Sequence, residues 1–125
     1  MKEFDFTPDE MKTACDRIIN AFGLARRAGK CAVGADICIE LIRKKKAKLV
    51  LISDGVSDNT VKKLVNSCAF HNVELLHIPL DKYKLGEKLG KKSGITCAAV
   101  TDDSFLNICR KVYLEVHKQS MEVQQ

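Results

Sequence analysis

Short apolar runs alternate with longer segments of helical periodicity, and this alternation constrains the fold more than any other feature. Residues 49–52 are four consecutive apolar residues between Lys48 and Ser53. A strand with no polar face belongs in a sheet that helices cover on both sides. Residues 95–100 form a second, almost entirely apolar run. Both runs are therefore predicted to be buried strands.

Helical patterns separate these strands. Apolar residues recur at helical spacing from Met11 to Ala25 and again within 37–42, 61–68 and 105–116. Thr7 and Pro8 predict the start of the first helix, and Gly29 predicts its end. Two further strands are expected at 30–33 and 73–78, and Pro79 should end the second. A short helix is expected at 85–89, with Gly90 at its end. Ser57 or Asp58 and Asp102 or Asp103 are the expected amino-terminal caps of two other helices.

The order of these elements predicts the fold class. Strands and helices alternate through nearly all of the 125 residues, a length typical of one domain. We expect an α/β protein, specifically a three-layer α/β/α sandwich whose central mixed sheet has about four strands. Residues 1–125 would form a single RNA-binding-type domain, for the reasons given below, with frayed ends at about 1–6 and 118–125.

The first residues, the apolar runs and the cysteines of the sequence predict the cellular location of the protein. The first residues are acidic and polar, unlike a secretory signal, and no window approaches the ~18 apolar residues of a membrane span. We therefore expect a cytoplasmic protein that does not enter a membrane. The six cysteines form no CxxC pair and lie within apolar patterns. They are predicted to be buried thiols that pack as small hydrophobic groups.

The net charge of +5 is concentrated in one part of the chain. Residues 17–101 hold 16 of the 21 basic residues but only 7 of the 16 acidic ones. A basic body with acidic ends is typical of proteins that bind polyanions. A well-solvated, Lys-rich surface is the alternative interpretation.

Motifs for catalysis or metal binding are weak. The stretch from Gly86 to Ser93 has three residues between its glycines where a phosphate-binding loop needs four, and its hydroxyl comes one place late. Cys68 and His71 form a CxxH pair without a second pair. We predict no enzyme activity, no catalytic residue, no cofactor and no metal. A thiol-based or His71-based enzyme or small-molecule site stays as a minor alternative.

Three predicted loops are the better candidates for a binding site, at residues 30–36, 53–59 and 79–84. The first leads into a helix, whose free amino-terminal amides suit phosphates or base edges. The other two follow the carboxyl ends of predicted strands, where open α/β sheets hold their ligands. Basic residues flank all three loops.

Several segments resemble a known family. They are FGLARRAGK at 22–30, VG at 33–34, KAKLVLI at 46–52, LG at 85–86, GK at 90–91 and AVTD at 99–102. In this order and spacing the sequence resembles the kink-turn-binding ribosomal proteins, in particular their small bacterial YlxQ-like branch, from about Phe22 to Phe105. The resemblance implies an α/β/α sandwich without enzymatic activity, and it implies RNA binding, ribosome association or both.

The sequence departs from that family where its members read RNA. Typical members follow the glycine matching Gly34 with Asn and Glu at the places of Asp36 and Ile37, and with Lys at the place of Glu40. Here Asp36 can only accept hydrogen bonds, Ile37 offers an apolar contact and Glu40 repels phosphate. Because a good bidentate base contact gives roughly 1–3 kcal/mol of discrimination, these changes weaken the expectation of standard kink-turn recognition.

These observations predict a non-enzymatic protein that binds structured RNA and associates with ribosomal RNA, ribosomes or other translation proteins. Nothing demands an oligomer, so we expect a monomer. The alternative is a protein-interaction module that kept the fold and lost the RNA site. The predicted RNA-binding residues are Arg27, Lys30, Gly34, Ala35, Asp36, Ile37, Glu40, Asp54, Ser57, Leu80, Lys82 and Lys84.

Overall fold

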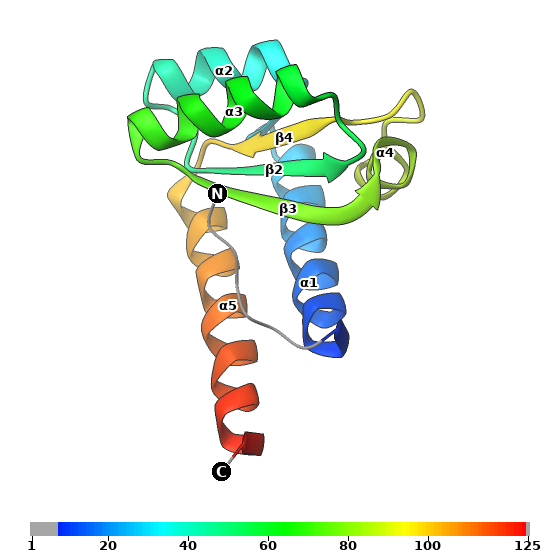
Figure 1. Cartoon of the computed structure of the whole chain (residues 1–125), viewed down its shortest axis with the longest axis vertical. Coiled ribbons are helices and arrows are strands. Elements are labelled where there is room, and N and C mark those ends of the chain that lie inside the picture. Colours follow the sequence, from blue (N-terminus) through cyan, green and yellow to red (C-terminus); the bar gives the residue numbers. More distant parts are fainter. Residues whose placement is uncertain (1–7, 125) are drawn as a thin grey trace.

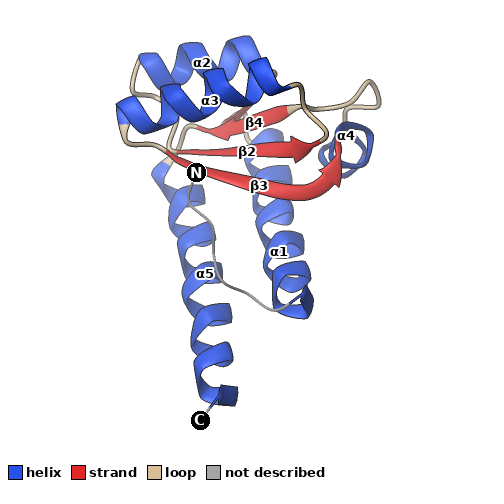
Figure 2. Ribbon diagram, viewed as in Figure 1, coloured by secondary structure: helices blue, strands red, loops and turns tan. Residues whose placement is uncertain are grey.

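A mixed four-stranded sheet lies between two layers of helices in the computed structural model, which describes residues 8–124 (Figure 1). Helices α2 and α3 cover one face, and α1, α4 and α5 cover the other (Figure 2). The predicted three-layer α/β/α fold is confirmed. The elements are α1 (Pro8–Arg27), β1 (Cys31–Val33), α2 (Ala35–Arg43), β2 (Leu49–Asp54), α3 (Asp58–His71), β3 (Glu74–Asp81), α4 (Lys82–Leu89), β4 (Cys97–Val100) and α5 (Asp103–Gln124).

The strand order places three strand ends together. The order is β1-β4-β2-β3, with β2 parallel to β3 and β4 antiparallel to both β1 and β2. Strands β1, β2 and β3 therefore run in the same direction. Their carboxyl ends and the beginning of β4 lie on one side of the sheet, and their amino ends lie on the other.

Each face of the sheet has its own apolar core. Val50 and Ile52 point toward α2 and α3, where they pack with Cys38, Ile42 and Leu64. The alternate residues of the same strand pack on the other face with α1, α4 and α5. Residues 49–53 are all buried, as the apolar run predicts. This two-sided burial fixes β2 as the centre of the sheet.

Most predicted helix ends are confirmed. Gly29 has φ 74° and ends α1, where Lys30 N donates to Ala25 O at 2.8 Å. Ser57 caps α3 by accepting from Thr60 N, and Asn72 ends that helix in the left-handed conformation. Asp102 accepts from Ser104 N at the start of α5. The predicted Thr7 cap lies outside the described residues.

Three expectations about the elements were wrong. Strand β3 does not stop at Pro79, because β3 pairs only with β2 and its register shifts opposite Ile52 and Asp54, so a residue without an N–H is tolerated there. The third predicted loop therefore does not exist: Leu80 belongs to β3, and Lys82 and Lys84 belong to α4. Ile37 does not face the core but is 55% exposed.

The C-terminal helix is longer than the sequence predicted. Helix α5 continues to Gln124, whereas we expected the tail to loosen after His117. The expected fraying of residues 1–6 lies outside the described residues. None of the described helices is long and apolar enough to cross a membrane.

All six cysteines are free thiols, and five of them are buried. Burial raises the pKa of Cys31 and Cys68 to about 11 and the pKa of Cys109 to about 12. Within residues 8–124 no cluster of three or more His, Cys, Asp or Glu residues could hold a metal ion. Five of the thiols are buried apolar core groups, as predicted, whereas Cys31 is only partly buried against the core.

Candidate nucleic-acid interface

The short segment that leads into β4 holds three distant parts of the chain together. Gly34 N donates to Cys97 O at 2.9 Å, and Ser53 N donates to Thr96 O at 2.9 Å. Ile95 N donates to Lys82 O at 2.8 Å. The starts of α2 and α4 and the turn after β2 therefore meet at one side of the sheet, at the right of Figure 1. We call residues 34–37, 53–58, 81–84 and 91–96 the Gly34 rim.

Gly34 sets the start of α2. Its φ of 109° lies in the region that favours glycine, although a Cβ there would meet no atom within 4 Å. No side chain caps this helix. The first amides of α2 lack acceptors within the helix and so are available to a ligand that carries phosphate or carbonyl oxygens.

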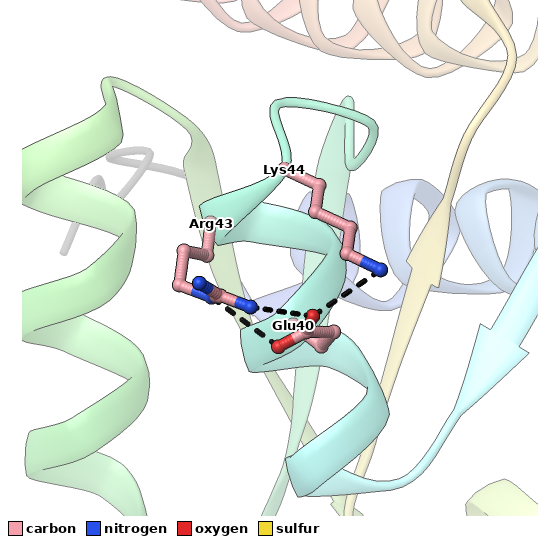
Figure 3. A network of polar contacts seen from close by, with 3 residues as sticks. All are labelled: Glu40, Arg43 and Lys44. Carbon is pink, nitrogen blue, oxygen red and sulfur yellow. Dashed lines mark hydrogen bonds and ion pairs between the residues drawn. The ribbon is translucent and has the colours of Figure 1, made fainter.

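The side chains of the first turns of α2 are accessible. Asp36 and Ile37 are exposed on the first turn. One turn on, Glu40 forms ion pairs with Arg43 at 2.6 Å and Lys44 at 3.3 Å (Figure 3). Hydrogen bonds from Arg43 and Lys44 hold the pKa of Glu40 below its usual value. The repulsion expected from Glu40 is thus compensated by two neighbouring cations.

The rest of the Gly34 rim surrounds an open hollow of about 490 Å³. Its lining includes Gly55 and Ser57 from the second segment, Thr60 from the first turn of α3, and Lys82 and Tyr83 from α4. Tyr83 is 61% exposed, and its ring lies beside Gly94 and 5.1 Å from Lys82 Nζ. An exposed aromatic ring at the wall of a hollow is suited to contact a planar group.

Two carboxylates of the rim are engaged within the protein. Asp81 caps α4 by accepting from the amides of Tyr83 and Lys84, each at 2.9 Å. Asp54 lies 3.2 Å from His77 Nε2. Both carboxylates therefore help to fix the local structure of the rim.

The turn at residues 91–94 belongs to this rim, although the loops predicted from the sequence did not include it. It packs directly on α4 at Gly86, where a Cβ would lie 2.3 Å from Lys91 O and 2.9 Å from Gly94 Cα. Lys92 and Ser93 are exposed there. The sequence pairs LG at 85–86 and GK at 90–91 could have indicated this turn, since Gly86 and Lys91 are the residues at which it packs on α4.

The structure separates some predicted site residues from the rim. Lys30 lies at the opposite side of the sheet, where its carbonyl accepts from Thr101 N at 3.0 Å. Arg27 lies beside the end of α4, next to Leu89 and Gly90. Leu80 packs against the core on the α1 face. The rim brings together Gly34, Ala35, Asp36, Ile37, Asp54, Ser57, Lys82 and Lys84, with Glu40 one turn away.

Charge on the Gly34 rim is balanced. Its segments contain four acidic residues, Asp36, Asp54, Asp58 and Asp81, and four basic ones, Lys82, Lys84, Lys91 and Lys92. Without Arg27 and Lys30, the side chains do not make this rim the strongly cationic surface that the sequence led us to expect. Backbone amides, the hollow and individual lysines remain as its binding groups.

Comparison with known proteins agrees with this architecture. The 15.5kD RNA binding protein of Giardia lamblia has the same fold, with a TM-score of 0.73 at 19% identity over 92% of this chain and 94% of that one. The RNA-binding protein YlxQ of Bacillus subtilis is 39% identical over 85 residues, which are 68% of this chain and 83% of that protein. The large ribosomal subunit protein eL30 of Oryza sativa is 26% identical over 73% of this chain and 82% of that protein.

The fold is therefore that of a ribosomal-protein-like α/β/α domain. The model of the ribosomal protein L7Ae/L30e/S12e/Gadd45 family matches residues 16–110. This match covers more than half of the sequence, and the chain belongs to that family. The resemblance inferred from the sequence motifs is confirmed.

Proposed function

We propose that this protein binds structured RNA at the Gly34 rim without catalysing a reaction. The observation that carries the proposal is the set of main-chain bonds from residues 95–97 to the starts of α2 and α4 and to the turn after β2. These bonds join uncapped helix amides and a hollow on one surface. RNA is commonly recognised by its shape and by its unstacked bases, and this surface offers groups for both.

An unpaired base is the part of the RNA that fits the hollow. Tyr83 provides an exposed ring for stacking, while Ser57 and Thr60 place hydroxyl groups across the hollow. Lys82 and Lys92 provide cations for the neighbouring phosphates. The names of the relatives, RNA-binding protein YlxQ and large ribosomal subunit protein eL30, support RNA as the ligand class.

The first turn of α2 favours a target other than the standard kink-turn. Asp36 cannot donate to base acceptors, and Ile37 offers only an apolar surface. We therefore propose an RNA whose bulged or looped base enters the hollow and whose neighbouring sugar or base packs on Ile37. Ribosomal RNA, ribosome association and a cytoplasmic location are part of this proposal.

A protein-interaction module is the second candidate, and the balanced charge of the rim favours it. A pull-down from lysate with and without ribonuclease separates the two candidates. Loss of the bound partners after ribonuclease supports the RNA function. Partners that persist after ribonuclease support the protein-interaction function.

Replacing Tyr83 tests the RNA function directly. With a hairpin RNA that contains an asymmetric internal loop, Tyr83→Ala should weaken binding by about 1–3 kcal/mol, whereas Tyr83→Phe should retain most of the affinity. Fluorescence anisotropy at several salt concentrations measures both effects. Equal affinity of Tyr83→Ala and the unchanged protein, or no binding at low salt, would contradict the proposal.

A further inference from the structure

The opposite side of the sheet carries a second concentrated group of cations. Residues 43–48 read RKKKAK and connect α2 to β2. Thr101 N donates to Lys30 O, and Lys48 N donates to Val100 O at 2.8 Å, so Lys30 belongs to the same side. We call Lys30 and residues 43–48, 72–74 and 101–103 the Lys45 rim, which lies at the left of Figure 1.

The acidic groups of this rim neutralise only part of its charge. Glu40, just inside it, pairs with Arg43 and Lys44, and Asp103 lies 3.6 Å from Lys48 Nζ. Asp102 accepts from Ser104 N. Glu74 of this rim lies 3.7 Å from Arg110, and Lys30 is close enough to Asp102 to help lower the pKa of that carboxylate. Lys45 and Lys46 are exposed, and neither forms an ion pair within the described part of the chain. Two cations are therefore available to an outside partner.

Lys45 occupies a conformation that does not favour lysine. Its φ of 61° lies in the left-handed region, where Gly or Asn is the usual residue after a helix. A residue with a Cβ costs of order 1 kcal/mol there. The helix dipole accounts for cations near the end of α2, but it does not require one at this strained position. A charged ligand provides a reason for lysine there.

The two rims lie at opposite edges of the sheet, although α2 contributes residues to both, with Ile37 and Arg43 about 9 Å apart along its axis. Residues 49–52 of β2 lie between the two rims, which corresponds to about 13 Å. The two rims also face away from each other, because they lie beyond opposite ends of the strands. A ligand segment held at one rim leaves the other rim open.

We infer that the Lys45 rim is a second RNA-binding surface, which holds the phosphate backbone of a separate RNA segment while the Gly34 rim holds a looped one. Its lysines are point charges, and no aromatic residue is among the residues of this rim. This composition fits backbone contacts that carry no sequence information. Simultaneous binding of two RNA segments rests on the proposed function of the Gly34 rim, whereas contact of the Lys45 rim with an RNA backbone does not.

The test uses a variant that preserves the fold. Lys45→Asn/Lys46→Gln removes two unpaired cations, and Asn suits the positive φ at position 45. The matched control is Lys12→Gln/Lys111→Gln, which removes the same charge from exposed positions of α1 and α5. The probe is a plain RNA duplex without loops, titrated between about 50 and 200 mM salt.

The rim variant should bind the duplex more than tenfold more weakly at about 100 mM salt, and its log–log salt slope should fall by about 1.8, as expected for two lost phosphate contacts. The control should stay within about twofold of the unchanged protein. Equal losses in the two variants would overturn the inference, because they would indicate attraction by net charge alone. Displacement of the duplex by poly-glutamate at equal charge concentration would overturn RNA as the partner.

Bridging is measured by recruitment. The internal-loop hairpin is immobilised and saturated with protein, and the labelled duplex is then added. The unchanged protein should recruit the duplex, while Lys45→Asn/Lys46→Gln should bind the hairpin equally and fail to recruit it. Recruitment by both would overturn the second surface. If the hairpin is not bound at all, the proposed function fails, and the duplex titration still decides the Lys45 rim by itself.

Discussion

The two rims of the sheet present different chemistry on one scaffold. The Gly34 rim has balanced side-chain charge, free helix amides, an exposed aromatic ring and a hollow. The Lys45 rim includes no aromatic residue, but it has two exposed cations, Lys45 and Lys46, without ion pairs among residues 8–124. The comparison shows that the basic charge evident in the sequence lies mainly away from the surface with the more specific shape.

Gly86→Ala should produce the largest effect and should act on the Gly34 rim alone. The new Cβ would lie 2.3 Å from Lys91 O, which is backbone and cannot move without displacing the turn at 91–94. Urea denaturation should show a loss of about 3 kcal/mol, with hairpin binding lost and duplex binding retained. Retained hairpin affinity in the folded variant would contradict the role of that turn.

Gly34→Ala should have the next largest effect. A side chain at φ 109° should cost about 1–3 kcal/mol in unfolding free energy, and the start of α2 should shift, which weakens hairpin binding. Gly23→Ala is the matched control, since Gly23 lies inside α1 and its Cβ would meet only Leu89 Cδ2 at 4.0 Å. That control should stabilise the protein by about 0.5–1 kcal/mol. A stabilised Gly34→Ala variant would disprove the conformational argument.

Glu40→Gln should have the smallest effect and should sharpen the difference between the rims. It releases Arg43 and Lys44, so duplex affinity at the Lys45 rim should rise about two- to fivefold. Hairpin affinity should change less, and thermal stability should barely change because the pair is exposed. An unchanged or lower duplex affinity, measured by anisotropy, would show that these cations do not contribute.

The ion pairs of Glu40 with Arg43 and Lys44 also predict how duplex affinity depends on pH. The pKa of Glu40 is lower in the folded protein than its usual value. The ion pairs of Glu40 are therefore fully formed at a pH above the usual carboxylate pKa, and they are lost as the pH falls through the lowered pKa. Duplex affinity of the unchanged protein should therefore rise at acidic pH by more than that of Glu40→Gln. Identical pH profiles for the two proteins would assign the change to other carboxylates.

Local patterns predicted most of the fold but less of the site. Gly29 and Ser57 act through nearest neighbours, and the apolar run at 49–52 acts through burial of a whole strand, so each was recognisable in the sequence. Pro79 misled the prediction because its tolerance depends on β3 lying at the edge of the sheet, which is a property of the strand order. A single sequence does not reveal that order.

The positions of Arg27 and Lys30 show the same limit within the site. Both are close to Gly34 in the sequence, yet the three-residue strand β1 separates Lys30 from the start of α2, and Arg27 faces the end of α4. The turn at 91–94 is distant from Gly34 in the sequence and joins the rim through its packing on α4 and through the pairing of β4. Proximity along the chain was therefore a poor guide to which charges share a surface.

Mainly main-chain hydrogen bonds join the segments of the Gly34 rim, with Cys97 O, Thr96 O and Lys82 O as acceptors, and the buried Ser53 hydroxyl adds one to Thr96 O. Exposed side chains such as Ile37 and Ser93 consequently have little share in maintaining the architecture. Libraries that randomise such positions should yield folded proteins with altered target preference. The domain is in this sense a natural starting point for selecting binders of new ligands.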